Sequence, residues 1–269
     1  MVKSGNAVHA LAFFQFLLRQ GKNFIINYFR VRLSYFMAHK KLIRFAQLET
    51  FDNVLQFPKN IKGKWRQFFK NENSIVLELA CGKGEYAIGL GMLCPQKNFI
   101  GIDIKGNRIW VGAKKAIENK LHNVAFLRTQ IDQVNDYFSK DEVSEIWITF
   151  PDPQLRKSKA KKRLTHPKFL RLYQQFLKQG GCIHLKTDSP NLYDFTKTVI
   201  KLYGCILLKD HENLYADETI TDELKIKTHY ESLDIAQSNR IHYLCFSLPL
   251  ELPAKDADEE LKQVLKDEG

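Results

Sequence analysis

Short apolar runs alternate with segments of helical periodicity from Ser74 onward. This alternation is typical of an α/β protein with a doubly wound, parallel sheet. The runs that we interpret as strands are 74–79, 99–104, 124–128, 145–150, 182–186 and 241–248. Because the sequence carries no internal repeat, we expect one sheet with helices packed on it rather than a repeat array.

Helices are predicted between these runs, where apolar residues recur at helical spacing. The first helix follows the turn that ends at Gly84. The second has an apolar stripe made of Ile109, Ala113, Ala116 and Ile117. A third is expected over 165–178, stopped by Gly180 and Gly181, and a further one begins near Pro190.

The chain is expected to divide into an apolar and basic extension (1–48), one domain (49–250) and an acidic polar tail (251–269). The apolar run 7–18 is too short to span a bilayer, and no small-residue cleavage site follows it. Residues 1–36 are interpreted as an extension not needed for chemistry, with Met37 as a candidate start. A functional anchor, a surface helix or a transit-like leader are the alternatives.

Composition is consistent with one cytoplasmic domain that binds an anion. The chain has 269 residues, 44% of them hydrophobic, and a formal net charge of +11, which suggests nucleic acid as a partner. The five cysteines include no close C-x-x-C pair, so we expect buried free thiols and no metal site. An ordinary basic surface remains the alternative to a nucleic-acid partner.

A nucleotide-type cofactor site is predicted where the first strand meets its helix. Gly82 and Gly84 allow close approach of the backbone to a ligand, and Asp103, at the end of the next strand, can accept hydrogen bonds from a ribose. NAD enzymes share these features. Glu78 favours S-adenosylmethionine instead, because a carboxylate attracts the ammonium group of that cofactor and repels a pyrophosphate. Capping of the turn is the alternative role for Glu78.

The fourth strand ends in Phe150-Pro151-Asp152-Pro153, which is the most specific motif in the chain. Ligands of such sheets bind at the carboxyl ends of the strands, so Asp152 is expected to face the reacting group. The cationic run 156–163 begins four residues later and suits contacts with phosphates. A plain Pro-Asp-Pro turn and a solvated basic loop are the alternatives.

Taken in order, these motifs resemble the bacterial tRNA (guanine-N7-)-methyltransferase family. The resemblance also includes Lys162-Arg163-Leu164, Thr187-Asp188 and Thr228-His229-Tyr230-Glu231, and it extends from about Lys41 to Leu248. It implies a class I methyltransferase fold with a mostly parallel sheet and a late antiparallel strand. It further implies a monomer or homodimer that methylates a variable-loop guanosine, without a metal or stable membrane association.

The resemblance implies three sets of site residues. Cofactor contacts would come from Glu78, Gly82, Gly84, Asp103, Gln130 and Asp152, with Asp152 also catalytic. Guanosine or tRNA contacts would come from Arg156, Asp188, Thr228, His229, Tyr230 and Glu231. Phosphate contacts are expected from Lys157, Lys159, Lys161, Lys162 and Arg163.

The chain departs from the family at Ala80, where Gly is common, at Gln130, where Asp or Asn is common, and at Gln154-Leu155-Arg156, where Trp-Pro and then Lys are common. Gln130 can still hydrogen-bond an adenine. Asp188 could instead cap the following helix, and Glu231 could be a surface charge. A methyltransferase for another RNA or a small molecule, a nucleic-acid-binding protein with a degenerate pocket, and an NAD-dependent oxidoreductase are the competing hypotheses.

Overall fold

The computed structural model describes residues 41–233, 240–254 and 256–267. The chain divides into two compact units, Met1–Gln47 and Leu48–Gly269. In the first unit, residues 41–47 are helical, and the predictions for 1–36 and Met37 lie outside the described residues. Within the part of the chain that is described, no helix has both the length and the apolar character needed to cross a membrane.

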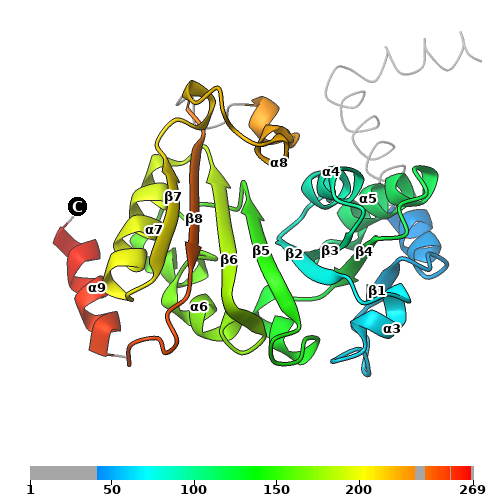
Figure 1. Cartoon of the computed structure of the whole chain (residues 1–269), viewed down its shortest axis with the longest axis horizontal. Helices are drawn as coiled ribbons and strands as arrows, with labels where there is room; N and C mark the ends of the chain where they lie inside the picture. Colours follow the sequence, from blue (N-terminus) through cyan, green and yellow to red (C-terminus); the bar gives the residue numbers. More distant parts are fainter. Residues whose placement is uncertain (1–40, 234–239, 255, 268–269) are drawn as a thin grey trace, which may run out of the picture. The chain divides into compact units, whose positions relative to one another are not determined.

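The second unit is built on one sheet of eight described strands, in the order β1-β4-β3-β2-β5-β6-β8-β7 (Figure 1). The bounds are β1 Val54–Gln56, β2 Ser74–Leu79, β3 Lys97–Asp103, β4 Val124–Arg128, β5 Val143–Thr149, β6 Leu177–Thr187, β7 Ile206–His211 and β8 His242–Ser247. Neighbours pair in parallel except for β8, which runs antiparallel to β6 and β7. The predicted doubly wound sheet with a late antiparallel strand is confirmed.

The helices follow the strands in the expected alternation. Their bounds are α3 Trp65–Phe69, α4 Glu85–Leu93, α5 Gly106–Glu118, α6 Pro167–Tyr173, α7 Pro190–Leu202, α8 Asp222–Lys225 and α9 Asp256–Asp267. The 3-10 turns are η1 Ile131–Asp136, η2 Lys157–Lys162, η3 Leu214–Ala216 and η4 Glu231–Leu233.

The predicted helix 165–178 was too long, because β6 begins already at Leu177. Pairing with β5 jumps from Val143–Leu177 to Glu145–Cys182, so the residues between Leu177 and Cys182 form a bulge. Gly180 lies there with φ of 72°, in the left-handed region that glycine adopts at little cost. The glycines therefore bend a strand instead of ending a helix.

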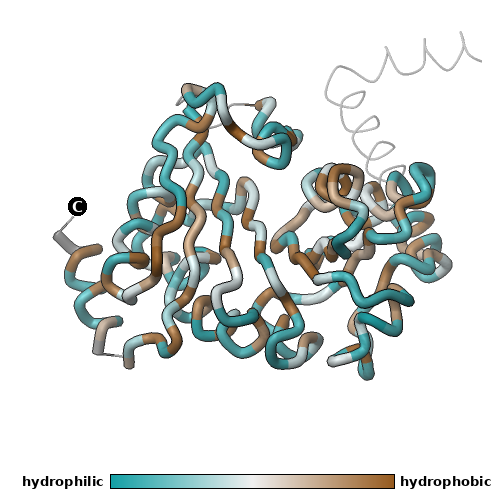
Figure 2. Tube along the Cα trace, viewed as in Figure 1, coloured by the Kyte–Doolittle hydropathy of each residue, from teal (hydrophilic) through white to brown (hydrophobic). Residues whose placement is uncertain are grey.

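One face of the sheet forms the main hydrophobic core. Alternating residues of the central strands are fully buried there against α3, α6 and α7: Leu77, Leu79, Ile100, Ile102, Ile146, Ile148, Ile183, Leu185, Leu244 and Phe246. Figure 2 shows hydrophobic residues along the strands and hydrophilic residues in the loops that connect them. The opposite face carries polar and aromatic residues at the alternate positions, among them Glu78, Trp147 and His184.

The expected acidic tail contains a helix that belongs to the domain. Leu261 of α9 is buried in the main core, and Asp258 accepts hydrogen bonds from Arg171 at 2.8 Å and from Tyr203. One of the acidic residues that suggested a solvated tail, Asp258, therefore attaches α9 to the domain. The apolar residues between the acidic ones pack against the main core.

Candidate active site

The carboxyl ends of β2, β3, β5 and β6 bring most of the predicted site residues to one edge of the sheet. The order of the strands reverses between β2 and β5, which are neighbours although β3 and β4 separate them in the sequence. A crevice forms at such a switch point, outside the strand ends. Most of the residues discussed below lie at or just after the end of one of these strands; Gln130 follows β4, and a further group belongs to the segment between β7 and β8.

The turn after β2 combines a close-packed glycine with an open one. Gly84 has φ of 65°, and a Cβ at this position would lie 2.3 Å from the Phe126 ring. Gly82 has φ of 57°, but an added Cβ there would meet nothing within 4 Å. Gly84 thus serves packing, whereas the free space beside Gly82 fits the approach of a ligand to the backbone. Ala80 has φ of 55°, which explains why glycine suits that position.

Glu78 is a buried carboxyl group at the end of β2, with both oxygens hydrogen-bonded. One accepts from the Ala87 amide of α4 at 2.8 Å and the other from the Thr149 hydroxyl of β5 at 3.1 Å. The side chain is 3% exposed, and burial raises the pKa of Glu78 to about 8. The capping role considered for Glu78 is therefore present. Neither of the two hydrogen-bond donors is a cation, so these contacts do not neutralise the charge of the carboxylate form.

Asp103 closes the turn from the neighbouring strand. Its carboxylate accepts from the Gly82 amide at 3.0 Å and from the Lys105 amide at 2.8 Å, and the residue is buried. Gln130, after β4, is exposed and precedes η1. Glu78, Gly82 and Asp103 are thus gathered around one turn, as predicted, with Gln130 following the next strand.

The Phe150–Pro153 motif turns the chain away from β5. The Phe150 amide donates to the Lys186 carbonyl at 2.8 Å, and φ of Phe150 is 47°. Asp152 is exposed, and its carboxylate accepts from the Gln154 amide at 3.0 Å. The turn geometry expected for Pro-Asp-Pro is therefore present, and it leaves one carboxylate oxygen of Asp152 outside that hydrogen bond.

The cationic run forms η2, and its members do not share one role. Five cations are exposed: Arg156, Lys157, Lys159, Lys161 and Lys162. Arg163 is 5% exposed and donates to the carbonyls of Pro153 at 3.2 Å and Gln154 at 3.3 Å. Its guanidinium also lies 4.4 Å from the centre of the Phe195 ring. Its guanidinium therefore braces the segment after Asp152, which leaves the five exposed cations as the readier phosphate contacts, and the phosphate contact of Arg163 stays a prediction.

Asp188 follows β6 and is half-buried. The N-cap of α7 is Ser189, whose hydroxyl accepts from the Leu192 amide at 3.3 Å. The alternative that Asp188 caps this helix is therefore wrong, since the adjacent serine fills that position. Asp188 thus follows the end of β6, the neighbour of the strand that leads into Asp152.

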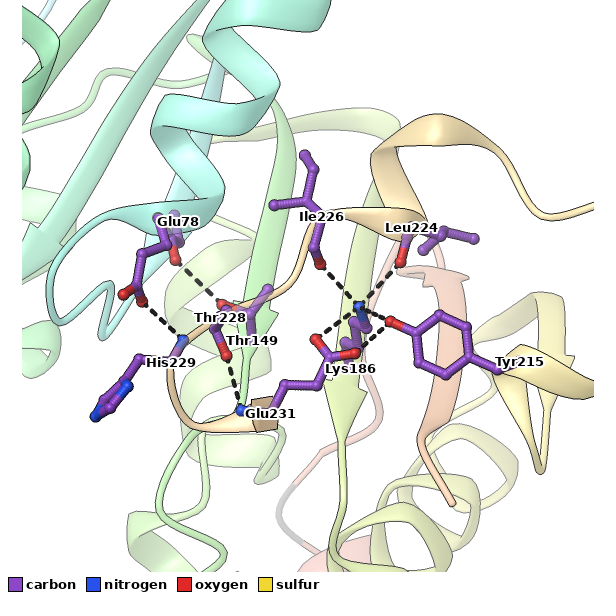
Figure 3. A network of polar contacts seen from close by, with 10 residues as sticks. Glu78, Thr149, Lys186, Tyr215, Leu224, Ile226, Thr228, His229 and Glu231 are labelled. Atoms are coloured by element: carbon purple, nitrogen blue, oxygen red, sulfur yellow. Dashed lines mark hydrogen bonds and ion pairs between the residues drawn. The ribbon is translucent and has the colours of Figure 1, made fainter. Parts of the chain in front are cut away.

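A buried lysine that the sequence analysis missed organises the segment between β7 and β8. Lys186 is 0% exposed, and its ammonium contacts the Leu224 carbonyl at 2.9 Å and the Ile226 carbonyl at 3.0 Å (Figure 3). It also contacts Glu231 at 3.1 Å and the Tyr215 hydroxyl at 3.0 Å. Burial lowers the pKa of Lys186, and Glu231 opposes that shift. A lysine within a predicted strand was the signal available in the sequence.

Glu231 is held by other side chains in this segment. Its side chain is 4% exposed and bonds to Lys186 and to the Tyr215 hydroxyl. The surface-charge alternative is wrong, since the carboxylate is buried. Contact of Glu231 with the substrate stays a prediction.

The rest of the Thr228–Glu231 segment lies beside α4 and α5. The His229 amide donates to Glu85, the first residue of α4, at 3.3 Å, and the Thr228 hydroxyl accepts from the Glu231 amide at 3.2 Å. Arg108 of α5 lies 5.8 Å from the centre of the Tyr230 ring. Figure 1 shows the α8 region above the carboxyl ends of β5 and β6. The structure thus brings this late segment to the helix that follows the glycine turn.

Comparison with known proteins adds family relationships to this geometry. The methyltransferase family model Methyltransf_4 matches residues 72–244. A tRNA (guanine-N(7)-)-methyltransferase of Bacteroides fragilis is 43% identical over 235 residues, which cover 84% of this chain and 92% of that protein. Enzymes of the same name from Porphyromonas gingivalis and Christiangramia forsetii are each 46% identical, covering 75% and 78% of this chain and 86% and 99% of their own lengths.

Solved structures support the fold independently. The crystal structure of the 16S rRNA methyltransferase KamB superimposes with a TM-score of 0.54 at 14% identity, covering 70% of this chain and 94% of that one. At such low identity the likeness concerns the class I methyltransferase fold alone. The extent and identity of the sequence matches decide the family: this chain belongs to the tRNA (guanine-N7-)-methyltransferases.

Proposed function

We propose that the enzyme transfers the methyl group of S-adenosylmethionine to N7 of a guanosine in the variable loop of tRNA. The observation that carries this proposal is the placement of Asp152. It follows the end of β5, where Thr149 contacts buried Glu78, and it precedes the exposed cations of η2. A carboxylate between a cofactor turn and a cationic surface suits a reaction on a nucleobase of a large polyanion.

The residues around the glycine turn fit the proposed cofactor. Glu78 would face the ammonium group, Asp103 would accept from the ribose hydroxyls, and Gln130 would hydrogen-bond the adenine. The open space beside Gly82 and the lack of a cationic partner in the hydrogen bonds of Glu78 support this assignment. When bound, S-adenosylmethionine supplies an electrophilic methyl group on a cationic sulfur.

The proposed mechanism needs no general base at the reacting atom, because N7 of neutral guanine has an available lone pair. The chain therefore has to bind, orient and stabilise charge. Asp152 would hold the purine in a reactive pose and stabilise the positive charge that develops on the ring. Its carboxylate is exposed and fixed on one side by the Gln154 amide, so it is oriented before the substrate arrives.

Selection of guanine would depend on acceptors for N1–H and the exocyclic amine. Asp188 is the carboxylate proposed for this role, because it directly follows β6, the neighbour of the strand that leads to Asp152. Adenine presents an acceptor at N1 and would face a carboxylate unfavourably. Thr228, His229 and Tyr230 would border the nucleoside, and Arg156 would contact the tRNA backbone.

Cofactor binding at Glu78 is expected to release a proton near neutral pH. With its pKa raised to about 8, free Glu78 is mostly protonated at pH 7, whereas an adjacent ammonium favours the carboxylate. Affinity for S-adenosylmethionine should therefore rise from pH 6.5 toward pH 8 and then level off. Calorimetry in buffers of different ionisation enthalpy measures the proton directly.

Glu78→Gln is the matched control for this pH dependence. Loss of a charge-assisted contact of about 1.5–3 kcal/mol should weaken binding by about 10- to 100-fold, and the Glu78-dependent part of the pH profile should vanish. Ionisation of the cofactor's own amine affects both proteins equally. Equal pH profiles and proton release in the two proteins would show that Glu78 does not face the cofactor's charge.

The exposed lysines of η2 should determine the salt dependence of tRNA binding. Lys161→Gln combined with Lys162→Gln should weaken binding and flatten the slope of log affinity against log salt by about 1 to 2. Lys114→Gln with Lys115→Gln, an adjacent exposed pair on α5, should leave the slope unchanged. Filter binding between low and moderate salt provides the measurement, and equal slopes for both double variants would refute the phosphate role of η2.

The position within tRNA can be tested with transcripts. Replacing the variable-loop guanosine by adenosine should abolish methyl incorporation, whereas replacing a guanosine elsewhere in an unpaired loop should not. Full incorporation into the transcript without the variable-loop guanosine would place the modified nucleotide elsewhere and leave the family assignment standing.

A further inference from the structure

Two thiols and an imidazole come together on the polar face of the sheet, along β6 and β8. Cys182 and His184 alternate on β6 and so face the same side, and Cys245 is the residue directly opposite His184 on β8. One ligand atom from each of the three residues lies within 4.8 Å of the other two. Cys245 and His184 are buried, and Cys182 is half-buried. The cluster lies within the strands, apart from the strand ends that carry Asp152 and Asp188.

The imidazole is held in place and keeps one nitrogen available. Nδ1 of His184 shares a hydrogen bond of 2.7 Å with the Tyr243 hydroxyl, and the ring stacks on Trp147 with centroids 3.9 Å apart and planes 4° apart. Within the described part of the chain, Nε2 has no hydrogen-bond partner although the residue is only 9% exposed. A buried polar atom left without a partner costs free energy, so a missing ligand would account for it.

The donor set is characteristic of one class of metal ion. Two thiolates and a neutral imidazole suit Zn²⁺, whose tetrahedral sites take sulfur and nitrogen ligands at about 2.0–2.3 Å. Ligand atoms of a tetrahedral zinc site lie about 3.5–4 Å apart, so closing this cluster requires a shift of about an ångström.

The surroundings also supply an outer shell. Oε2 of Glu145, on β5, lies 3.9 Å from His184 Nε2, and its Oε1 bonds to Lys97 at 2.5 Å. Whichever imidazole nitrogen takes the metal, the other therefore faces Tyr243 or Glu145, the arrangement that orients metal-bound histidines. Glu145 and His184 also line a cavity of about 210 Å³, which offers an entry path.

From this geometry we propose that Cys182, His184 and Cys245 form a structural zinc site that ties β6 to β8. The proposed site would replace the expectation of no metal, which rested on the spacing of cysteines along the chain. It does not depend on the proposed tRNA methylation. Bound zinc would fix the half of the sheet from which Lys186 and Asp188 emerge.

The test uses the full chain, kept reduced with a non-chelating phosphine, and titrates it with Co²⁺ and then Zn²⁺. We expect one Co²⁺ per chain with thiolate charge-transfer and tetrahedral visible bands, displacement by one Zn²⁺, and a higher Tm with zinc. Cys182→Ser and Cys245→Ser should each lose these bands. Cys205→Ser, at a free cysteine outside the cluster, should keep them.

A second measurement needs no variant. Alkylation of the wild-type protein followed by mass spectrometry should show that zinc protects Cys182 and Cys245 and leaves the labelling of Cys94 and Cys205 unchanged. Absence of stoichiometric cobalt binding, or protection that does not distinguish the two cysteine pairs, would overturn the zinc site.

Discussion

Replacing Asp152 by alanine is expected to lower the rate of tRNA methylation at saturating cofactor by about 100- to 1,000-fold. In the proposed mechanism its carboxylate orients guanine and stabilises the positive charge that develops on the ring. The affinity for S-adenosylmethionine should change much less, because in the proposed site Glu78, Gly82 and Asp103 provide the main contacts. Asp152 is exposed, and surface substitutions usually change stability little, so the Tm of the variant should remain within about 1 °C of wild type.

Asp152→Asn separates the charge from the shape of the turn. The asparagine oxygen can still accept from the Gln154 amide, but the negative charge is lost. We therefore expect Asp152→Asn to be nearly as defective as Asp152→Ala in single-turnover assays, while Asp136→Asn, an exposed control after β4, keeps wild-type rates. Normal activity of Asp152→Asn would reduce the role of Asp152 to that of a turn residue.

Replacing Lys186 by methionine is expected to have the second large effect, this time on folding and on tRNA together. The substitution removes the shared donor of the Leu224 and Ile226 carbonyls and leaves the Glu231 carboxylate buried without its cation. Breaking a buried ion pair in this way costs about 3–5 kcal/mol. We expect a lower Tm, faster tryptic cleavage at Lys225 and Lys227, and loss of most tRNA methylation.

Two comparisons distinguish loss of the Lys186 contacts from general destabilisation of the protein. Lys178→Met, at an exposed position of the same strand, should leave stability and cleavage unchanged. Combining Lys186→Met with Glu231→Gln should cost less than the sum of the two single changes, because the buried charge is then absent. Additive losses, or protection from trypsin equal to wild type in Lys186→Met, would contradict the anchoring role of Lys186.

The fold could be predicted because its central strands are apolar runs bounded by turn residues. The prediction missed β7, whose residues are largely exposed, and β1, which has three residues, since neither gives a distinctive pattern. It also extended α6 through Lys178, because glycines in a bulge cannot be told from a helix stop without the β5 partner. The helix α9 was missed because its acidic surface outweighs its few apolar positions.

The candidate site, like the fold, could be predicted only in part. Motif residues that lie at or just after strand ends, such as Glu78, Asp103 and Asp152, could be named because parallel strands gather their ends at one edge. The buried contacts of Arg163 and Glu231 could not be predicted, because a charged residue in a motif does not reveal whether its side chain faces solvent or a buried partner. The Cys182, His184 and Cys245 cluster depends on pairing between β6 and β8, which no local spacing encodes.

The most direct test of the central claim is to identify the product nucleoside. The purified protein is incubated with S-adenosylmethionine carrying a labelled methyl group and with unmodified tRNA, and the digested RNA is separated by chromatography with mass detection. We predict labelled 7-methylguanosine as the product, absent with Asp152→Ala. A different labelled nucleoside, or no label in tRNA from a protein that binds the cofactor, would contradict guanosine N7 methylation by this enzyme.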